Sequence, residues 1–376
     1  MARKLKSDKL LFTATLLLVC TSVVMVYSAS AVVAMENHHD PHLYLFKQGA
    51  WALVGLFLVT VVMRIDYGHY RRPAVIWTAL IVVGLALVAA LFARPINGAS
   101  RWLGIWGLGV QPSEFAKIAV IVFVAALLER RMDRVAEAPS TLLPIAVVVA
   151  AIVGLILPEP DLGTAVMILM ITAVMIFAAG ISYQYVLGLF LVTPPALYLL
   201  VMASEYRRRR VLAFLDPWAD PLGNGYQMVQ SMIAVGTGGV FGRGLMGGVQ
   251  KLFYLPEPHH DFIFAVIAEE LGLIGATVVL ACFCVIAWRG LRTAVRAPDR
   301  FGAFLAIGLT AMVTLQAFLN VSVVLGVVPP KGIPLPFVSY GGSSLLANLV
   351  AMGILLNISQ HASTTQVITT TMAQDA

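Results

Sequence analysis

The sequence predicts an all-α polytopic membrane protein with ten transmembrane helices. Hydrophobic residues make up 60% of its 376 residues, charged residues make up only 12%, and the mean hydropathy is +0.89. Soluble domains carry roughly 25% charged residues. Apolar runs of about 20 residues recur along the chain, and a helix of that length crosses the hydrocarbon core of a bilayer. We therefore expect a single integral-membrane domain over residues 1–376.

The expected spans follow the apolar runs in chain order. They lie at approximately 10–34, 45–63, 73–92, 113–129, 141–157, 162–180, 184–203, 261–288, 301–326 and 343–358. The first run follows a basic segment, is too long for the apolar part of a signal peptide and lacks a clear cleavage site, so we interpret it as a span. The polar, Thr-rich tail at 360–376 is expected to be disordered.

Basic residues at the ends of the spans predict the orientation. They gather at the N-terminus and in the turns at 64–72, 130–134 and 289–300, which alternate onto one side, as is typical of the cytoplasmic side. Both termini are then cytoplasmic, and the large loop at 204–260, between spans seven and eight, is extracytoplasmic. Because this anchoring accounts for the net charge of +6, no nucleic-acid partner is expected.

Cations in the outer loops mark the candidate site. The arginine cluster at 207–210 contradicts the positive-inside bias, which suggests a functional role; alternatively, a long loop is translocated whatever its charge. Arg101, Arg243, Lys251 and Lys331 add further positive charge. A guanidinium binds phosphate through two hydrogen bonds. These loops therefore suit a substrate with a phosphate head group and a lipid tail.

Asp261 follows two histidines where the large loop meets the eighth span. Burial there would raise its pKa and nearby cations would lower it, so this carboxylate can act as a general base; alternatively, it caps the helix. Glu269 lies about 12 Å deeper along the helix. A metal site is a further alternative, although its spacing follows no standard pattern. It would draw on His38, His39, Asp40, His42, His259 and His260.

Two shorter outer loops add candidate residues. Pro112 starts a helix on which Glu114 and Lys117 are neighbours about one turn into the membrane, where ionisable groups either face a cavity or anchor the helix. Asp161 either caps the sixth span or binds substrate. The loop at 329–344 is too rich in proline and glycine for a continuous helix, so it is buried in protein or lines a wet cavity.

Several motifs of the chain resemble the SEDS family (shape, elongation, division and sporulation). They are GASRW at 98–102, QPSEFAK at 111–117, PDLGT at 160–164, the run 207–227, KLFYLPE at 251–257, HDFIFA at 260–265, EELG at 269–272 and the run 334–342. The similarity covers nearly all of residues 10–360. The runs at 207–221 and 339–348 resemble the division branch, FtsW, more than the elongation branch, RodA.

The resemblance implies a peptidoglycan glycosyltransferase of the bacterial inner membrane, with its active site on the periplasmic face. Such an enzyme polymerises lipid II into glycan strands during cell division or elongation. The implied reaction is an inverting transfer with an aspartate as general base and undecaprenyl pyrophosphate as leaving group. The implied partners are lipid II, the nascent glycan strand, a class B penicillin-binding protein and other divisome or elongasome proteins.

The resemblance also assigns roles to residues. Asp261 matches the catalytic acid of the family, and one departure is His260, where many relatives have Thr or Ser. The expected substrate-binding residues are Arg101, Trp102, Glu114, Lys117, Asp161, Arg207, Arg208, Arg209, Arg210, Lys251, His260, Glu269, Lys331 and Ser339. A divalent cation, Mg²⁺ or Mn²⁺, could stabilise the pyrophosphate, and the sequence does not assign the residues that would bind this ion. No organic cofactor is expected.

Two other functions use the same residues. A lipid II flippase would pass the head group along Glu269, Glu270 and Gln316 inside the bundle. A scaffold would only recruit the transpeptidase and would keep its function without Asp261 and Arg101. The polar residues gather on the outer side rather than along a path through the bundle, which favours the enzyme.

Overall fold

The computed structural model describes residues 7–93, 100–105, 108–132, 138–180, 183–202, 205–223, 225–252 and 254–374. A helix lies in each of the ten ranges expected to span the membrane. These helices are α1 (Lys9–His38), α2 (Leu43–Val62), α3 (Pro73–Leu91), α4 (Pro112–Arg131), α5 (Ala138–Ile156), α6 (Leu162–Ala178), α7 (Tyr183–Met202), α10 (Ile263–Val295), α11 (Arg300–Val324) and α12 (Gly342–Gln374).

Six of these helices are long and apolar enough to cross a membrane. They are α1, α2, α3, α10, α11 and the Gly342–Ala362 part of α12, and the apolar stretches Ser140–Ile156 and Leu162–Ala178 are shorter. α4 is not among these six; it carries Glu114 in its first turn and Arg130 and Arg131 in its last. Several membrane crossings are therefore part of the fold.

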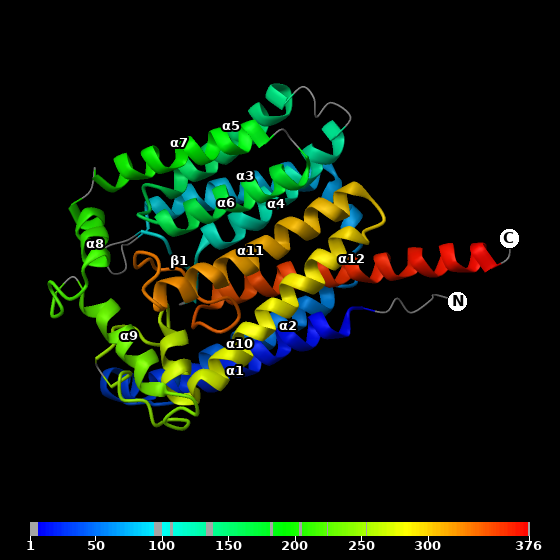
Figure 1. Ribbon diagram of the computed structural model, residues 1–376. Coiled ribbons are helices and arrows are strands. Elements are labelled where there is room, and N and C mark those ends of the chain that lie inside the picture. Colours follow the sequence, from blue (N-terminus) through cyan, green and yellow to red (C-terminus); the bar gives the residue numbers. More distant parts are fainter. Residues whose placement is uncertain are drawn as a thin grey trace.

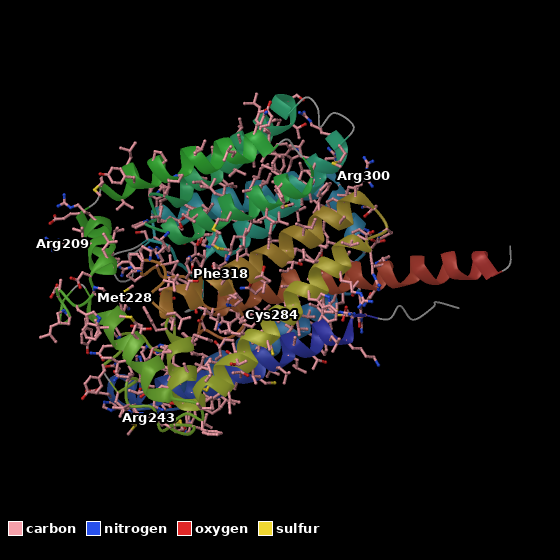
Figure 2. All side chains as sticks on the ribbon, viewed as in Figure 1. Arg209, Met228, Arg243, Cys284, Arg300 and Phe318 are labelled. Carbon is pink, nitrogen blue, oxygen red and sulfur yellow. The ribbon has the colours of Figure 1, made fainter. Side chains whose placement is uncertain are left out.

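The long helices run side by side in one bundle (Figure 1). α10 packs on α1 and α11, α12 packs on α2, and α4 packs on α3, α6 and α11. The beginning of α1 and the end of α12 lie at one end of the bundle, and α8 (Glu205–Leu215) and α9 (Tyr226–Gly238) lie at the other. Arg209 and Arg243 are at the α8 and α9 end, whereas Arg300 is at the opposite end (Figure 2).

The outer loops carry regular structure. Part of the long loop at 204–260 is helical, because α8 and α9 fold within it. The loop after α3 contains the antiparallel strands β1 (Leu103–Ile105) and β2 (Leu108–Val110), in which Leu103 pairs with Val110. A short 3₁₀-helix, η1 (Tyr67–Arg71), connects α2 to α3. α8, α9 and the hairpin lie at one end of the bundle (Figure 1), whereas η1 packs near the start of α11 at the other end, where Tyr67 stacks on Phe301.

α10 is two helices joined at a break. Gly272 has φ 67° and ψ −166°, which no helical residue adopts. The chain at 239–244 pairs with the backbone groups that the break leaves free: Arg243 N donates to Glu269 O (3.0 Å) and Leu273 N donates to Gly239 O (2.9 Å). A Cβ on Gly272 would lie 2.3 Å from Gly242 N, so glycine is needed for this approach.

The tail differs from the expectation of disorder over 360–376. α12 continues to Gln374 and projects beyond the other helices (Figure 1). The reason is that the segment holds no glycine or proline after Gly353, so the tail extends a helix that is already nucleated. Polarity of the side chains alone does not end a helix.

Candidate functional site

Asp261 lies in the turn directly before α10, half-buried at the end of the bundle where α8 and α9 fold. The residue at the cap position of α10 is Phe262, with no side-chain capping bond, so the alternative that Asp261 caps this helix is wrong. Its backbone carbonyl accepts a hydrogen bond from Asn320 Nδ2 (2.7 Å). Its Oδ2 lies 3.1 Å from the position that a Cβ on Gly332 would take. The loop at 327–341 therefore closes over this carboxylate.

Charges from three other segments surround Asp261. Burial raises its pKa to about 7, Arg210 and Arg101 act to lower it, and Asp161 and Glu257 act to raise it. A carboxyl group whose pKa lies near neutrality can both accept and release a proton at working pH. The structure thus places two of the outer-loop cations, Arg101 and Arg210, within electrostatic reach of the carboxylate that the sequence singled out.

Arg101 joins the hairpin loop to the turn between α5 and α6. Its Nε donates to the backbone oxygen of Glu159 (2.8 Å), and its Nη2 donates to that of Pro160. Trp102 packs within the hairpin, where a Cβ on Gly109 would lie 3.2 Å from its ring. Arg101 is therefore fixed by backbone carbonyls while its charge still acts on Asp261.

Asp161 caps α6, as one of the two sequence interpretations held. Its carboxylate accepts from Thr164 N (3.1 Å), Thr164 Oγ1 (2.7 Å), Ser113 Oγ (3.2 Å) and Gln111 Nε2 (3.0 Å). The bonds from Ser113 and Gln111 tie the start of α6 to the start of α4. Asp161 thus positions the two helices, and its charge adds to the field at Asp261.

Glu114 and Lys117 form the pair that their spacing predicts. Lys117 Nζ lies 2.9 Å from Glu114 Oε2, and both side chains are buried. Lys117 also donates to Gln316 Oε1 (2.7 Å), and Gln316 Nε2 donates to the backbone oxygen of Pro334 (2.9 Å). A continuous chain of polar contacts therefore links α4, α11 and the loop at 327–341.

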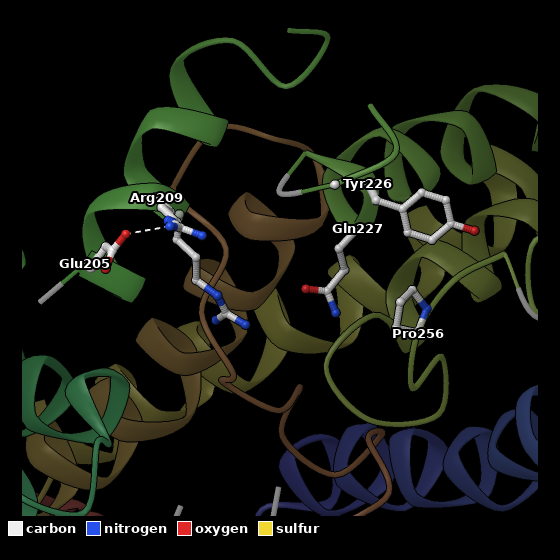
Figure 3. A pocket seen from close by; sticks show the side chains of 7 residues that line it. Glu205, Arg209, Tyr226, Gln227 and Pro256 are labelled. Atoms are coloured by element: carbon white, nitrogen blue, oxygen red, sulfur yellow. Dashed lines mark hydrogen bonds and ion pairs between the residues drawn. The ribbon is translucent and has the colours of Figure 1, made fainter. Parts of the chain in front are cut away.

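Two residues of the arginine cluster, Arg209 and Arg210, line a cleft of about 560 Å³ between α8 and the segment that begins α9 (Figure 3). Arg209 pairs with Glu205 at 2.5 Å, Arg208 is exposed, and Arg210 is half-buried. The side chain of Arg207 lies outside the described residues. The cleft is lined by Glu205, Arg209, Arg210, Gly223, Tyr226, Gln227 and Pro256. Arg210 lines the cleft and also acts to lower the pKa of Asp261, so the cleft lies within electrostatic reach of this carboxylate.

Lys251 and Glu269 lie in buried contacts of their own and do not line this cleft, and their role in substrate binding stays a prediction. Lys251 is 3% exposed, and its Nζ lies 2.6 Å from Glu270 Oε1 and 2.9 Å from Ser28 Oγ. Glu269 is fully buried and accepts from the backbone N–H groups of Val249 (2.8 Å) and Gln250. Both residues hold the segment at 239–255 on α10. Lys251 also holds this segment on α1, through Ser28. The break in α10 lets this segment pack against the helix.

The remaining expected residues lie around the loop at 327–341. Lys331 is half-buried, and burial lowers its pKa. Ser339 is buried, and its Oγ accepts from Leu335 N (2.8 Å), so it shapes the loop. His260 Nδ1 lies 3.0 Å from the backbone oxygen of Tyr340. These contacts set the loop beside Asp261.

Sequence reasoning missed two residues of the site. Asn320 Nδ2 donates both to Asp261 O and to Ile333 O (2.8 Å), so one amide holds the two outer segments together. A usable signal was present, because Gln316 and Asn320 are amides one turn apart in an apolar span. Glu159 is fully buried, neither of its carboxylate oxygens accepts a hydrogen bond, and burial raises its pKa to about 8.

Known proteins resemble this sequence over nearly its whole length. The profile of the family of FtsW, RodA and SpoVE, described as "Cell cycle protein", matches residues 8–364. The chain belongs to this family. The SEDS resemblance is thereby confirmed, and with the apolar helices it makes the chain a multi-pass membrane protein.

Similar proteins cover almost the whole chain. The "Probable peptidoglycan glycosyltransferase FtsW" of Geobacter metallireducens is 45% identical over 94% of both chains. One solved structure, titled "Structural coordination of polymerization and crosslinking by a peptidoglycan synthase complex", has TM-score 0.77 and 31% identity and covers 95% of this chain and 99% of that one. The rod shape determining protein RodA of Thermus thermophilus has TM-score 0.70 and 27% identity, with 95% and 97% covered.

Proposed function

We propose that this chain is a peptidoglycan glycosyltransferase that polymerises lipid II into glycan strands, with Asp261 as the general base. The relative named for this activity is 45% identical over 94% of both chains, which supports the assignment. One observation of the site carries it. The Asp261 carboxylate caps no helix, is half-buried, and lies in the field of Arg101 and Arg210.

The proposed reaction uses one carboxylate and several cations. Asp261 accepts the proton of the C4 hydroxyl of the acceptor sugar as that oxygen attacks the anomeric carbon of the donor. A new glycosidic bond forms with inversion, while the bond from the anomeric carbon to pyrophosphate breaks and its electron pair leaves with the phosphate. Glycosidases need a second carboxyl group to protonate a poor leaving group. Arg101, Arg210 and Lys331 stabilise the departing pyrophosphate instead.

A divalent cation, Mg²⁺ or Mn²⁺, belongs to this proposal, whereas an organic cofactor does not. Such ions are commonly held by one or two carboxylates together with phosphate oxygens of the substrate. Glu257 offers a 60% exposed carboxylate close enough to Asp261 to act on its pKa, so the donor chemistry fits. The ion would add positive charge beside the leaving group.

The proposal extends to topology and partner. α1 to α7 and α10 to α12 cross the bacterial inner membrane with both termini in the cytoplasm, and the end with α8 and α9 faces the periplasm. A class B penicillin-binding protein is the proposed partner. The similar solved structure is titled as a complex that coordinates polymerisation and crosslinking, which supports this choice. The FtsW name of the relative favours a role in cell division.

Lipid II polymerisation by the purified complex tests the proposal. We expect Asp261→Asn to abolish glycan polymer while thermal unfolding and partner binding stay unchanged. Asp216→Asn is the matched control, because Asp216 is exposed on the same end of the bundle and lies outside the cleft. Polymer formation by Asp261→Asn at the parent rate contradicts the assignment of Asp261 as the general base.

The flippase alternative has less support in this structure. It needs Glu269 and Glu270 free to line a path through the bundle. Glu269 instead accepts backbone N–H groups of the outer segment, and Glu270 pairs with Lys251 and Ser28. A translocation assay on reconstituted protein, with no polymer formed, distinguishes the two functions.

A further inference from the structure

Three side chains of metal-binding type converge in the turn before Asp261. Glu257 Oε2 lies 3.6 Å from His259 Nε2 and 3.5 Å from His260 Nε2. The ligand atoms of all three residues lie within 4.8 Å of one another. Ligands at 2.0–2.2 Å from a tetrahedral ion are separated by about 3.4 Å. The two contacts of Glu257 therefore have the spacing of ligands around one ion.

His259 is a buried polar side chain without a partner. It is 2% exposed, and neither of its ring nitrogens has a hydrogen bond. Its ring packs on Tyr44, with centroids 4.8 Å apart, and on Tyr340. A buried polar group left unpaired costs about 1–3 kcal/mol, so such a group normally has a ligand. The nitrogen that faces Glu257 is thus available for one.

His260 is oriented as a metal ligand. Its Nδ1 lies 3.0 Å from the carbonyl oxygen of Tyr340, which can only accept, so Nδ1 carries the proton and donates. Nε2 is then left with its lone pair and faces Glu257. Histidines that bind metals almost always donate their other ring N–H to such an oxygen, which fixes the tautomer.

We propose that Glu257, His259 and His260 bind one divalent transition metal ion, Zn²⁺ or Mn²⁺. Two imidazole nitrogens and one carboxylate oxygen suit these ions, whereas Mg²⁺ prefers oxygen ligands alone. Glu257 has φ 48°, an unfavourable conformation for this residue, and it turns the carboxylate towards the two rings. Three protein ligands leave at least one coordination position open, as in sites that also bind an oxygen of a substrate.

The position of the site gives the ion a structural consequence. Tyr340 N donates to His259 O (2.9 Å), so the turn with the ligands is already attached to the loop at 327–341. A bound ion would lock residues 257–260 in this arrangement and so fix the backbone that enters Asp261. The site shares Glu257 with the cation of the proposed function, but its test measures binding and local order and so is independent of the activity.

Metal binding by the purified chain tests the inference. The chain, without a polyhistidine tag and stripped with EDTA, is titrated with Co²⁺ as a spectroscopic probe and with Zn²⁺ followed by elemental analysis. We expect one ion per chain. Glu257→Gln and His260→Thr should each weaken binding at least about 10-fold, which is the smallest effect usual for a residue that supports a metal site. Both variants replace side chains that are partly exposed.

A second histidine cluster supplies the control. His42→Thr alters the neighbouring group at 38–42, which is not part of the proposed site. We expect this variant to bind Co²⁺ like the parent chain. Parent protein that takes up no ion overturns the proposal, and so does binding that is lost in His42→Thr but kept in His260→Thr. Thermal unfolding in the absence of metal identifies a variant that fails to fold, in which case His260→Gln replaces it.

Discussion

Replacing Glu159 by glutamine should make the fold more stable, and increasingly so as pH rises. Glu159 is fully buried without a hydrogen bond to its carboxylate. Its pKa is raised from 4.5 to about 8, first by burial and then by Asp161, with Arg101 acting in the opposite direction. The unfolded chain therefore releases this proton near pH 4.5, whereas the folded chain keeps it until about pH 8.

The sign and the size follow from this difference. Below pH 4.5 Glu159 is protonated in both the folded and the unfolded state, so it does not change the stability. Between pH 4.5 and about 8 the folded state becomes less stable as pH rises, because the unfolded chain releases the proton and the folded chain keeps it. Above about pH 8 both states are ionised, and this loss of stability is constant. At 1.36 kcal/mol per pKa unit, the interval corresponds to about 5 kcal/mol at most. Glutamine has nearly the same shape and no proton to lose, so Glu159→Gln removes this penalty.

Thermal unfolding in detergent, from pH 5 to pH 9, measures the effect. The midpoint of Glu159→Gln should exceed that of the parent by an amount that grows up to about pH 8 and then levels off. Glu205→Gln controls for the loss of a carboxylate as such, because Glu205 is 64% exposed. A difference that is independent of pH, or that shrinks as pH rises, would falsify the reasoning about the buried carboxyl group.

Three other substitutions test the packing around the site. Lys117→Met leaves Glu114 buried without its partner and should lower the free energy of unfolding by about 3–5 kcal/mol, much of which the added change Glu114→Gln recovers. Chemical denaturation of the parent and of both variants checks this. Gly272→Ala should leave little monodisperse protein on size-exclusion chromatography, because its Cβ meets backbone, whereas Gly236→Ala has open space and should behave as the parent does. Asn320→Ala leaves the backbone carbonyls of Asp261 and Ile333 without their hydrogen-bond donor and should lower the free energy of unfolding by about 1–3 kcal/mol. It should also lower kcat for lipid II polymerisation more than it raises KM, and an unchanged kcat contradicts this.

Features that depend on neighbours in the sequence were predictable. The apolar runs place the long helices because backbone in a membrane must satisfy its own hydrogen bonds. Glu114 and Lys117 meet because residues three apart share a helix face, and Asp161 caps α6 because it precedes the first turn. The structure confirms these contacts, which require no knowledge of how the helices pack. Asp261 was singled out by its place at a loop end and by resemblance, and its role is still a prediction.

Features that depend on distant segments could not be predicted in the same way. Lys251 and Arg209 are both cations of the long outer loop, but one is buried against Glu270 and the other is 60% exposed. The difference arises from the break at Gly272, which lies inside an expected span and leaves no signal in the periodicity. The cleft between α8 and α9 likewise depends on how two helices far from the bundle core are placed.

The helix α10 begins at Ile263, but its first residues, up to the break at Gly272, are bonded to the outer segment. Residues 263–271 are joined by backbone hydrogen bonds and by Glu269 and Glu270 to the segment at 239–251. These parts are also tied to α1 through Ser28, and Asp261 is tied to α11 through Asn320, so one network of contacts joins the outer segment, the start of α10 and the bundle. A protein that binds the exposed face of the segment at 239–251 would therefore be connected to Asp261 through this network rather than through the loop alone.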